Sequence, residues 1–182
     1  SGGIIHRLTH SSNVRMASFS PDGSYVATAS HDRTAKVWSV ESGKLVKAFK
    51  ENKSYVISAS FSPDSQHLVT ASFDGTNKIW DVPNGKLLSI LKTTYGPNHN
   101  NIISATYSQD GVGIVTQDLN DRVKIRNTKN ESLLNAFELK ATLSDIDWVN
   151  KRLLGVRNAF LCLFDLELQQ ELFKWVAVGQ GD

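Results

Sequence analysis

The sequence predicts an all-β fold built from a repeated unit of short antiparallel strands. The first observation is the stretch Val26–Val40, which reads as a strand, a tight turn at His31–Arg33 and a second strand ending on Trp38. The second observation is that the stretch recurs at Val69–Val82, where Trp80 follows 42 residues after the first tryptophan. Helical periodicity is poor throughout the chain. A repeat of this length, with an aspartate six residues before the tryptophan, is typical of β-propellers.

The first repeat divides into four strands separated by turn residues. The turn at Pro21–Gly23 is preset, because proline fixes φ and glycine tolerates positive φ. A later turn at Glu41–Gly43 leads the chain into the last strand of the repeat. The expected strands are Val14–Phe19, Tyr25–Ser30, Ala35–Val40 and Lys44–Phe49. Four antiparallel strands in about 40 residues match the length and strand count of a propeller blade.

Three further repeats follow, and they become looser towards the C-terminus. The third carries an insertion of four residues within 93–100, and the fourth has Phe164 in the place of the tryptophan. Glu167–Val176 could also be read as a helix, and a strand is preferred because the repeat frame requires one there. The expected strands are Val56–Phe61, His67–Ser72, Thr76–Val82, Leu87–Leu91, Ile102–Tyr107, Gly113–Thr116, Val123–Arg126, Leu133–Phe137, Leu143–Trp148, Leu153–Val156, Phe160–Leu166 and Leu172–Val176.

The run Ile4–Leu8 precedes the first repeat, in the position that Lys44–Phe49 holds before the second. We therefore expect Ile4–Leu8 to be the outer strand of a neighbouring blade. Residues 1–182 are interpreted as one propeller domain or half-propeller, with residues 1–8 as that strand and blades at about 9–50, 51–92, 93–138 and 139–178. The start at Ser1 has neither a methionine nor the apolar core of a signal peptide, so the natural protein is expected to continue on either side.

Composition narrows the class of function. The chain is 40% hydrophobic and 21% charged, and its net charge of +2 comes from dispersed lysines and arginines. Neither nucleic acid nor an anionic membrane is therefore expected as the main partner. No apolar run reaches the length of about 18 residues that a transmembrane helix needs. The single cysteine, Cys162, excludes an internal disulfide and fits a reducing compartment, which favours the cytoplasm, with the nucleus as the alternative.

These repeats resemble the WD40 family, strongly in the first half of the chain and weakly in the second. His10, Thr28, Asp32 and Trp38 stand at the spacings of that family's structural tetrad. The resemblance implies a chain of hydrogen bonds inside the blade, from the indole through the hydroxyl and the imidazole to the carboxylate. Such a chain is sensible, because a buried indole N–H needs an acceptor and a neutral imidazole can relay between hydroxyl and carboxylate. Thr9 stands where the family usually has glycine, which alters the turn and keeps the histidine.

The match to the tetrad becomes less complete from one repeat to the next. The second repeat keeps Thr70, Asp74 and Trp80 but has Asn52 in the place of the histidine. The corresponding residues are Thr116, Asn120 and Arg126 in the third repeat and Leu154, Asn158 and Phe164 in the fourth. A structural network can be replaced blade by blade by apolar packing, whereas a catalytic one cannot.

An alternative reading of the first tetrad is a hydrolase triad, because Thr28, His10 and Asp32 have suitable side chains. We reject it, since a nucleophile must be exposed beside an oxyanion site and the resemblance places this hydroxyl beneath Trp38. The five histidines show no metal-ligand spacing with Cys162 or with each other. No glycine-rich phosphate loop is present. The sequence therefore predicts a protein that is not an enzyme and has no metal or cofactor.

In WD40 propellers the narrow top face, around the central channel, commonly binds partners. The resemblance carries this role to Asn13, Arg15, His31, Tyr55, Ile57, Phe73, Asn101, Ile103 and Leu119. The apolar members of this set would form a patch of the kind that marks interaction sites. The alternative is that some of them turn inward and fill the channel wall. The leading interpretation is a scaffold that binds a peptide or protein partner on this face.

A second interpretation is a structural unit that completes a propeller ring. WD40 rings commonly have seven blades and sometimes eight, and each blade needs a neighbour on both faces. Two copies of a four-bladed chain would supply a ring with two-fold symmetry, the commonest symmetry of oligomers. We therefore expect either a homodimer that forms an eight-bladed ring or completion by the rest of a longer chain.

Overall fold

The computed structural model describes residues 2–92, 102–138, 142–147, 152–157, 160–165 and 170–176. These residues form strands arranged in four antiparallel sheets, each made of four consecutive strands in chain order. The described residues include no helix that is long and apolar enough to span a membrane. The predicted all-β class and its four-stranded blades are therefore confirmed.

Each sheet corresponds to one blade. Blade 1 comprises β1 (Val14–Phe19), β2 (Tyr25–Ser30), β3 (Ala35–Ser39) and β4 (Leu45–Phe49). Blade 2 comprises β5 (Val56–Phe61), β6 (His67–Ser72), β7 (Thr76–Asp81) and β8 (Lys86–Lys92). Blade 3 comprises β9 (Ile102–Tyr107), β10 (Gly113–Asp118), β11 (Arg122–Asn127) and β12 (Leu133–Glu138). Blade 4 comprises β13 (Thr142–Asp147), β14 (Arg152–Arg157), β15 (Phe160–Asp165) and β16 (Gln170–Val176).

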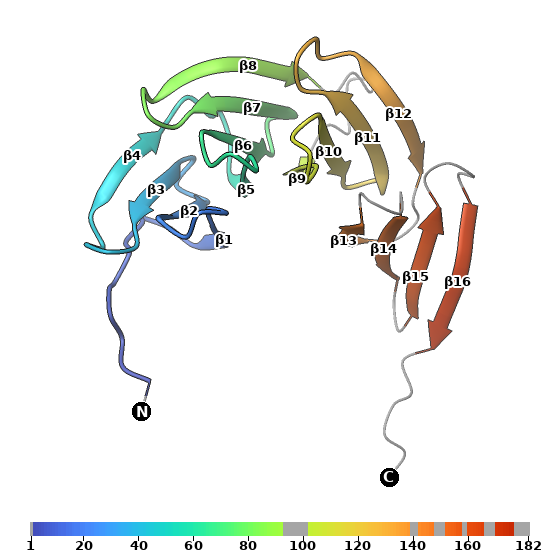
Figure 1. Cartoon of the computed structure of the whole chain (residues 1–182), viewed down its shortest axis with the longest axis horizontal. Coiled ribbons are helices and arrows are strands. Elements are labelled where there is room, and N and C mark those ends of the chain that lie inside the picture. Colours follow the sequence, from blue (N-terminus) through green and yellow to red (C-terminus); the bar gives the residue numbers. More distant parts are fainter. Residues whose placement is uncertain are drawn as a thin grey trace.

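The blades follow one another along an open arc (Figure 1). The first strand of each blade lies on the inner side of the arc and the last strand on the outer side. The inner strand β5 contacts both β1 and β9, so blades 1, 2 and 3 pack in sequence order. Blade 1 lies at one end of the arc and blade 4 at the other, and the described strands do not close a ring.

The same turn joins the first two strands in blades 1, 2 and 3. Asp22, Asp64 and Asp110 each accept a hydrogen bond from the serine hydroxyl two residues before and from the backbone N–H two residues after. The position after the aspartate has positive φ, at Gly23 with 72° and at Ser65 with 60°. Glycine adopts this conformation without steric cost, whereas serine is strained there. The aspartate therefore shapes the turn, as expected for turn residues.

Apolar side chains from facing blades form two clusters that join them. The cluster between blades 1 and 2 includes Ala27, Val37, Phe49, Val56, Phe61, Leu68, Trp80 and Val82. The cluster between blades 2 and 3 includes Val69, Ala71, Ile79, Leu91, Ile102, Ala105 and Ile114. Fully burying one valine, leucine or phenylalanine contributes about 1.5–3 kcal/mol, so these contacts dominate the packing of neighbouring blades.

Ile4–Leu8, the expected outer strand of a neighbouring blade, pairs with none of the four described sheets. Residues 2–10 belong to no strand, and the side chains of Ile4 and Ile5 are exposed. The segment touches blade 1 through His6, whose Nε2 lies 3.1 Å from the carbonyl oxygen of Glu41. A strand requires a ladder of backbone hydrogen bonds with a neighbour, and no such ladder forms here. The expected partner belongs to a neighbouring blade that is not among the four described sheets, so the outer strand stays a prediction.

Candidate functional site

A chain of hydrogen bonds crosses blade 1 from Trp38 to Asp32. The Trp38 indole Nε1 donates to Thr28 Oγ1 over 2.8 Å, and this oxygen lies 2.7 Å from His10 Nε2. On the other side of the ring, His10 Nδ1 lies 2.8 Å from Asp32 Oδ2. Strands β2 and β3 carry Thr28 and Trp38, the turn between them carries Asp32, and the segment before β1 carries His10. These are the four residues that the resemblance assigned to one network.

The hydrogen-bonding roles in this network follow from the chemistry of the groups. The Asp32 carboxylate can only accept, so Nδ1 of the neutral imidazole donates to it and Nε2 accepts the Thr28 hydroxyl proton. Burial opposes ionisation of Asp32, but hydrogen bonds from Thr34, His10 and backbone N–H groups outweigh it and hold the pKa of this carboxyl well below its usual range. Thr28 itself is buried. Its hydroxyl is therefore a structural link and is not placed to attack a substrate.

Blade 2 keeps part of this arrangement. The Trp80 indole Nε1 donates to Thr70 Oγ1 over 3.0 Å. In place of an imidazole, the ammonium of Lys78 donates to Asn52 Oδ1 over 3.0 Å and lies 3.5 Å from Asp74 Oδ2. The Lys78 and Asp74 side chains are only 5% and 9% exposed. A buried ion pair therefore occupies the place of the histidine–aspartate bond.

The Asp74 carboxylate has several further partners. Burial opposes its ionisation, but hydrogen bonds from Thr76 and the Lys53 backbone N–H and the charge of Lys78 lower the pKa of Asp74. Lys78 Nζ also donates to Thr76 Oγ1 over 3.0 Å. Because a buried ammonium needs acceptors for its three protons, these contacts make the lysine compatible with burial.

Sequence reasoning missed the part played by Lys78. The sequence did contain an indication of this role, because a lysine pairs with the tetrad threonine in each of the first three blades. The register pairs are Thr28 with Lys36, Thr70 with Lys78 and Thr116 with Lys124. Their environments differ, since the Lys36 ammonium lies 5.4 Å from the centre of the Trp38 ring and donates to the Thr9 carbonyl. Burial, and then the neighbouring Arg126, lower the pKa of Lys124.

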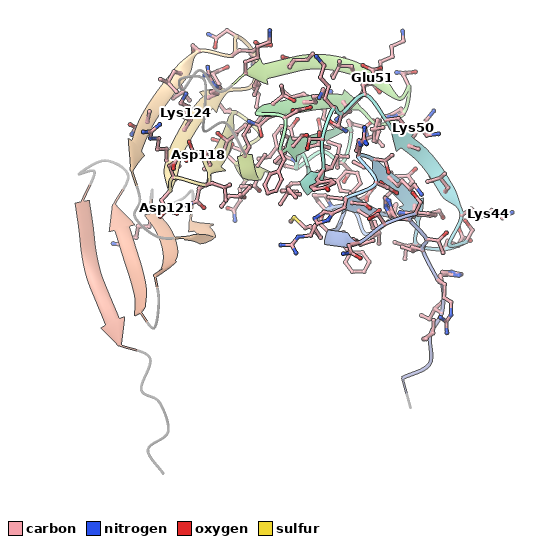
Figure 2. The ribbon with its side chains drawn as sticks, turned by 180° about the vertical axis from the view of Figure 1, so that it is seen from behind. Lys44, Lys50, Glu51, Asp118, Asp121 and Lys124 are labelled. Atoms are coloured by element: carbon pink, nitrogen blue, oxygen red, sulfur yellow. The ribbon has the colours of Figure 1, made fainter. Side chains whose placement is uncertain are left out.

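Blade 3 departs further from the tetrad. Asn120, at the aspartate position, is exposed, and the Arg126 guanidinium donates to the Glu131 carbonyl over 3.1 Å. The buried carboxylate here belongs to Asp118, two residues earlier, and accepts the Asn120 N–H over 2.8 Å. Figure 2 shows Asp118 and Lys124 in this blade. In the fourth repeat, Leu154 and Phe164 lie in β14 and β15, and Asn158 lies outside the described residues.

Three aromatic rings meet where blades 1 and 2 adjoin. The His31 and Tyr55 rings stack with centroids 4.4 Å apart and planes 16° apart, and the Phe73 ring lies 6.3 Å from that of Tyr55. His31 and Phe73 follow β2 and β6, and Tyr55 precedes β5. The His31 N–H donates to the Asn13 carbonyl over 2.9 Å, and the Phe73 N–H donates to the Tyr55 carbonyl over 3.0 Å. Tyr55 is 45% exposed and the other two rings are half-buried, so this aromatic ladder is partly open to solvent.

The other residues predicted for the binding face are spread more widely. Asn13 and Arg15 are exposed beside or within β1, and Leu119 is exposed after β10. Ile57 and Ile103 are half-buried on the inner strands β5 and β9. Asn101 lies outside the described residues. Among the nine predicted residues, ring contacts bring together His31, Tyr55 and Phe73. Within the described part of the chain, no group of three or more histidine, cysteine, aspartate or glutamate side chains is placed to hold a metal ion.

Comparison with known protein families matches two stretches of the chain. A family model described as WD domain, G-beta repeat, matches residues 2–39 and 43–81. These stretches contain the tetrad of blade 1, the lysine-containing network of blade 2 and all three rings of the aromatic ladder. A search of curated proteins finds no match to the chain.

Proposed function

The chain belongs to the WD40 repeat family, whose repeats generally serve as scaffolds for protein–protein interaction, and from this premise we propose that it binds a peptide or protein partner on its top face. The top face is the end of the blades that carries the turns after β2, β6 and β10. On this proposal the protein is not an enzyme. Its partner is neither nucleic acid nor membrane, and its compartment is the cytoplasm.

The aromatic ladder is the observation that supports this proposal. Tyrosine, histidine and phenylalanine rings offer large contact area with few rotatable bonds, and aromatic residues are enriched among those that dominate binding energy. The backbone bonds from His31 and Phe73 hold the rings to the loops before β1 and β5. A partner that covers the exposed part of Tyr55 would bury aromatic surface without having to order it first.

The test replaces Tyr55 or Phe73 by aspartate and compares the proteins captured from a cell lysate by each variant. The matched control is Leu134→Asp, which puts the same charge on an exposed apolar residue of the outer strand β12. We expect the partners captured by the unmodified chain and by the control to be lost with Tyr55→Asp and Phe73→Asp, while urea unfolding stays cooperative. Recovery of the same partners by all variants would contradict the proposal. Loss of cooperative unfolding would favour the channel-wall interpretation.

A second candidate function, ring completion, rests on the free face of blade 1. Val14 is 46% exposed and Phe19 is 69% exposed, whereas the residues 42 positions later, Val56 and Phe61, are 0% and 6% exposed in blade 2. Val40 and Leu45 are exposed on blade 1 as well. Apolar blade faces require a neighbour on each side. A second copy of the chain, giving an eight-bladed ring, or the rest of a longer chain would cover this face.

Light scattering distinguishes these two ways of completing the ring. A homodimer should have twice the 20.1 kDa mass of one chain, and Phe19→Asp should return it to the mass of one chain. A single-chain mass for the unmodified protein would exclude the homodimer and leave completion of the ring to the rest of a longer chain.

A further inference from the structure

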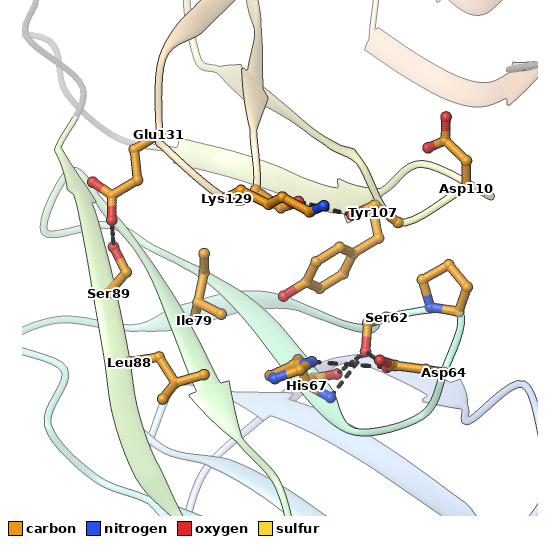
Figure 3. A pocket seen from close by; sticks show the side chains of 13 residues that line it. Ser62, Asp64, His67, Ile79, Leu88, Ser89, Tyr107, Asp110, Lys129 and Glu131 are labelled. Carbon is orange, nitrogen blue, oxygen red and sulfur yellow. Dashed lines mark hydrogen bonds and ion pairs between the residues drawn. The ribbon is translucent and has the colours of Figure 1, made fainter.

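A pocket of about 490 Å³ lies between blades 2 and 3 (Figure 3). Its walls are the turn between β5 and β6, the turn between β9 and β10, the turn between β11 and β12, and the outer strand β8. Strand β6 joins the β5–β6 turn at one end to the β6–β7 turn at the other, so the pocket lies at the opposite end of the blades from the top face. Its volume is within the range of sites that hold small ligands or side chains.

The pocket exists because polar residues replace the apolar ones that seal the equivalent place between blades 1 and 2. Phe61 and Val82 are buried in that first seam. The residues 46 positions later, Tyr107 and Thr128, line the pocket in the second seam. Tyr25, which packs against the first seam, corresponds to His67, which lines the pocket. The same backbone arrangement therefore gives a packed seam in one case and a polar hollow in the other.

The hydroxyl of Tyr107 points into this hollow towards His67 (Figure 3). Within the described part of the chain it makes no hydrogen bond. Burial, and then the charge of Asp64, raise the pKa of this phenol, so it stays protonated. Tyr107 is half-buried, and the buried Phe61 at the matching position shows that the fold itself needs no hydroxyl there. The hydroxyl is therefore available to a ligand.

The charge of the lining is negative, although the chain as a whole carries +2. Asp64, Asp110 and Glu131 provide three carboxylates against the single ammonium of Lys129. Burial opposes ionisation of Asp64, but hydrogen bonds from Ser62 and the Gln66 N–H lower its pKa and keep it ionised at neutral pH.

The walls of the pocket are braced and partly apolar. Glu131 accepts a hydrogen bond from the Ser89 hydroxyl, which ties β8 to the β11–β12 turn. The Thr128 hydroxyl donates to the Gly111 carbonyl over 2.8 Å, which ties the two turns of blade 3 together. Ile79 and Leu88 form the apolar side. The pocket is thus pre-formed, with an apolar side and an acidic rim.

We propose that this pocket binds an arginine side chain presented by a partner peptide. The guanidinium would donate to the Asp64 carboxylate and to the Tyr107 hydroxyl, and the methylene stem would lie along Ile79 and Leu88. Arginine fits better than lysine, because its planar fork pairs with carboxylates in two parallel bonds and stacks on aromatic rings. This site is separate from the top face and provides a second, charge-selective contact at the opposite end of the blades.

The experiment measures calorimetric binding of acetyl-Leu-Arg-Leu-amide to the whole chain. The matched probe contains citrulline, which keeps the shape of arginine and removes its charge. We expect the citrulline peptide to bind at least about tenfold more weakly, because a charge-assisted hydrogen bond is roughly twice as strong as a neutral one. Asp64→Asn should weaken arginine-peptide binding by about tenfold, and Tyr107→Phe by about threefold.

Asp22→Asn is the matched control variant. Asp22 accepts bonds from Ser20 and the Ser24 N–H as Asp64 does from Ser62 and the Gln66 N–H, but it does not line the pocket. Its replacement should leave peptide binding unchanged. The proposal is overturned by equal binding of the two peptides, by unchanged binding to Asp64→Asn and Tyr107→Phe, or by no binding at about 1 mM peptide. If Asp64→Asn does not unfold cooperatively, the test of the arginine pocket rests on the peptide binding of Tyr107→Phe.

Discussion

Blades 1 and 2 are built from nearly the same strands, but they satisfy their buried polar groups with different chemistry. In blade 1 the imidazole of His10 links Thr28 to Asp32. In blade 2 the ammonium of Lys78 enters from β7 and reaches Asp74 and Asn52. What the blade requires is that the carboxylate and the indole have partners, and more than one side chain can meet that requirement. The comparison shows how these repeats diverge without losing their frame.

The two blades also differ in their neighbours. Blade 2 packs against blade 1 on one face and blade 3 on the other, whereas among the described residues blade 1 has a neighbouring blade on one face only. Trp80 lies in the first seam with its ring centroid 4.9 Å from that of Phe49. Trp38, at the same position of blade 1, is also buried, but the rings and charges beside it are those of His10 and Lys36, and it is outside the apolar cluster that joins blades 1 and 2. Equivalent residues in the two blades should therefore contribute unequally to stability.

The largest expected effect comes from the tryptophans. Trp80→Ala should lower the free energy of unfolding by about 3–5 kcal/mol, because it leaves a cavity in a packed seam. Trp38→Ala should cost about 1–2 kcal/mol less, since Trp38, although buried, is not part of the apolar cluster that joins blades 1 and 2. Urea denaturation of both variants checks the difference. Equal losses would show that the free face of blade 1 is covered in solution.

The next effect separates two equivalent lysines. Lys78→Ala should destabilise the chain by about 2–4 kcal/mol, because it removes one partner of a buried ion pair and leaves Asp74 and Asn52 under-satisfied. Lys36→Ala should cost less than about 1 kcal/mol, since its ammonium is partly exposed. Urea midpoints of the two variants measure this difference in stability. Similar shifts would contradict the assignment of Lys78 to the buried network.

A smaller effect concerns the tetrad carboxylate. Asp32→Ala should cost roughly 1–3 kcal/mol, because it leaves His10 without its acceptor. The comparison variant is Asn158→Ala, at the equivalent position of the fourth repeat, where the sequence has no tetrad. Asn158→Ala should shift the urea midpoint less than Asp32→Ala does. Comparable shifts for the two variants would remove the basis for the tetrad in blade 1.

The smallest effect is a dependence of stability on pH. The folded-state pKa values of Asp32 and Asp74 lie below that of an unfolded aspartate, about 3.9. Their stabilisation is therefore fully present above about pH 5 and is lost as pH falls below about 4. Urea midpoints at pH 7 and pH 3 should show this loss, and Asp32→Asn should lose less over the same interval. A variant that loses as much as the unmodified chain would contradict the contribution of Asp32.

Local patterns in the sequence were enough to predict the fold class and the positions of the strands. The bounds of β1, β2, β5, β6 and β9 are those predicted, because alternation of apolar residues and turn chemistry are local properties. Strand ends differ by one or two residues elsewhere, as at β8, which begins at Lys86 and ends at Lys92. The composition of the first tetrad was also readable, since its spacing repeats that of a known family.

The contacts between residues of different strands and blades became visible in the three-dimensional arrangement. No local pattern shows that the ammonium of Lys78 takes the place of an imidazole, or that Tyr107 stands in a hollow where Phe61 fills a seam. Ile4–Leu8 has the composition of a strand and forms none, because a strand depends on a neighbour. Turns and strands follow from the conformational preferences of adjacent residues, whereas burial, ion pairing and strand pairing depend on groups that are distant in the sequence.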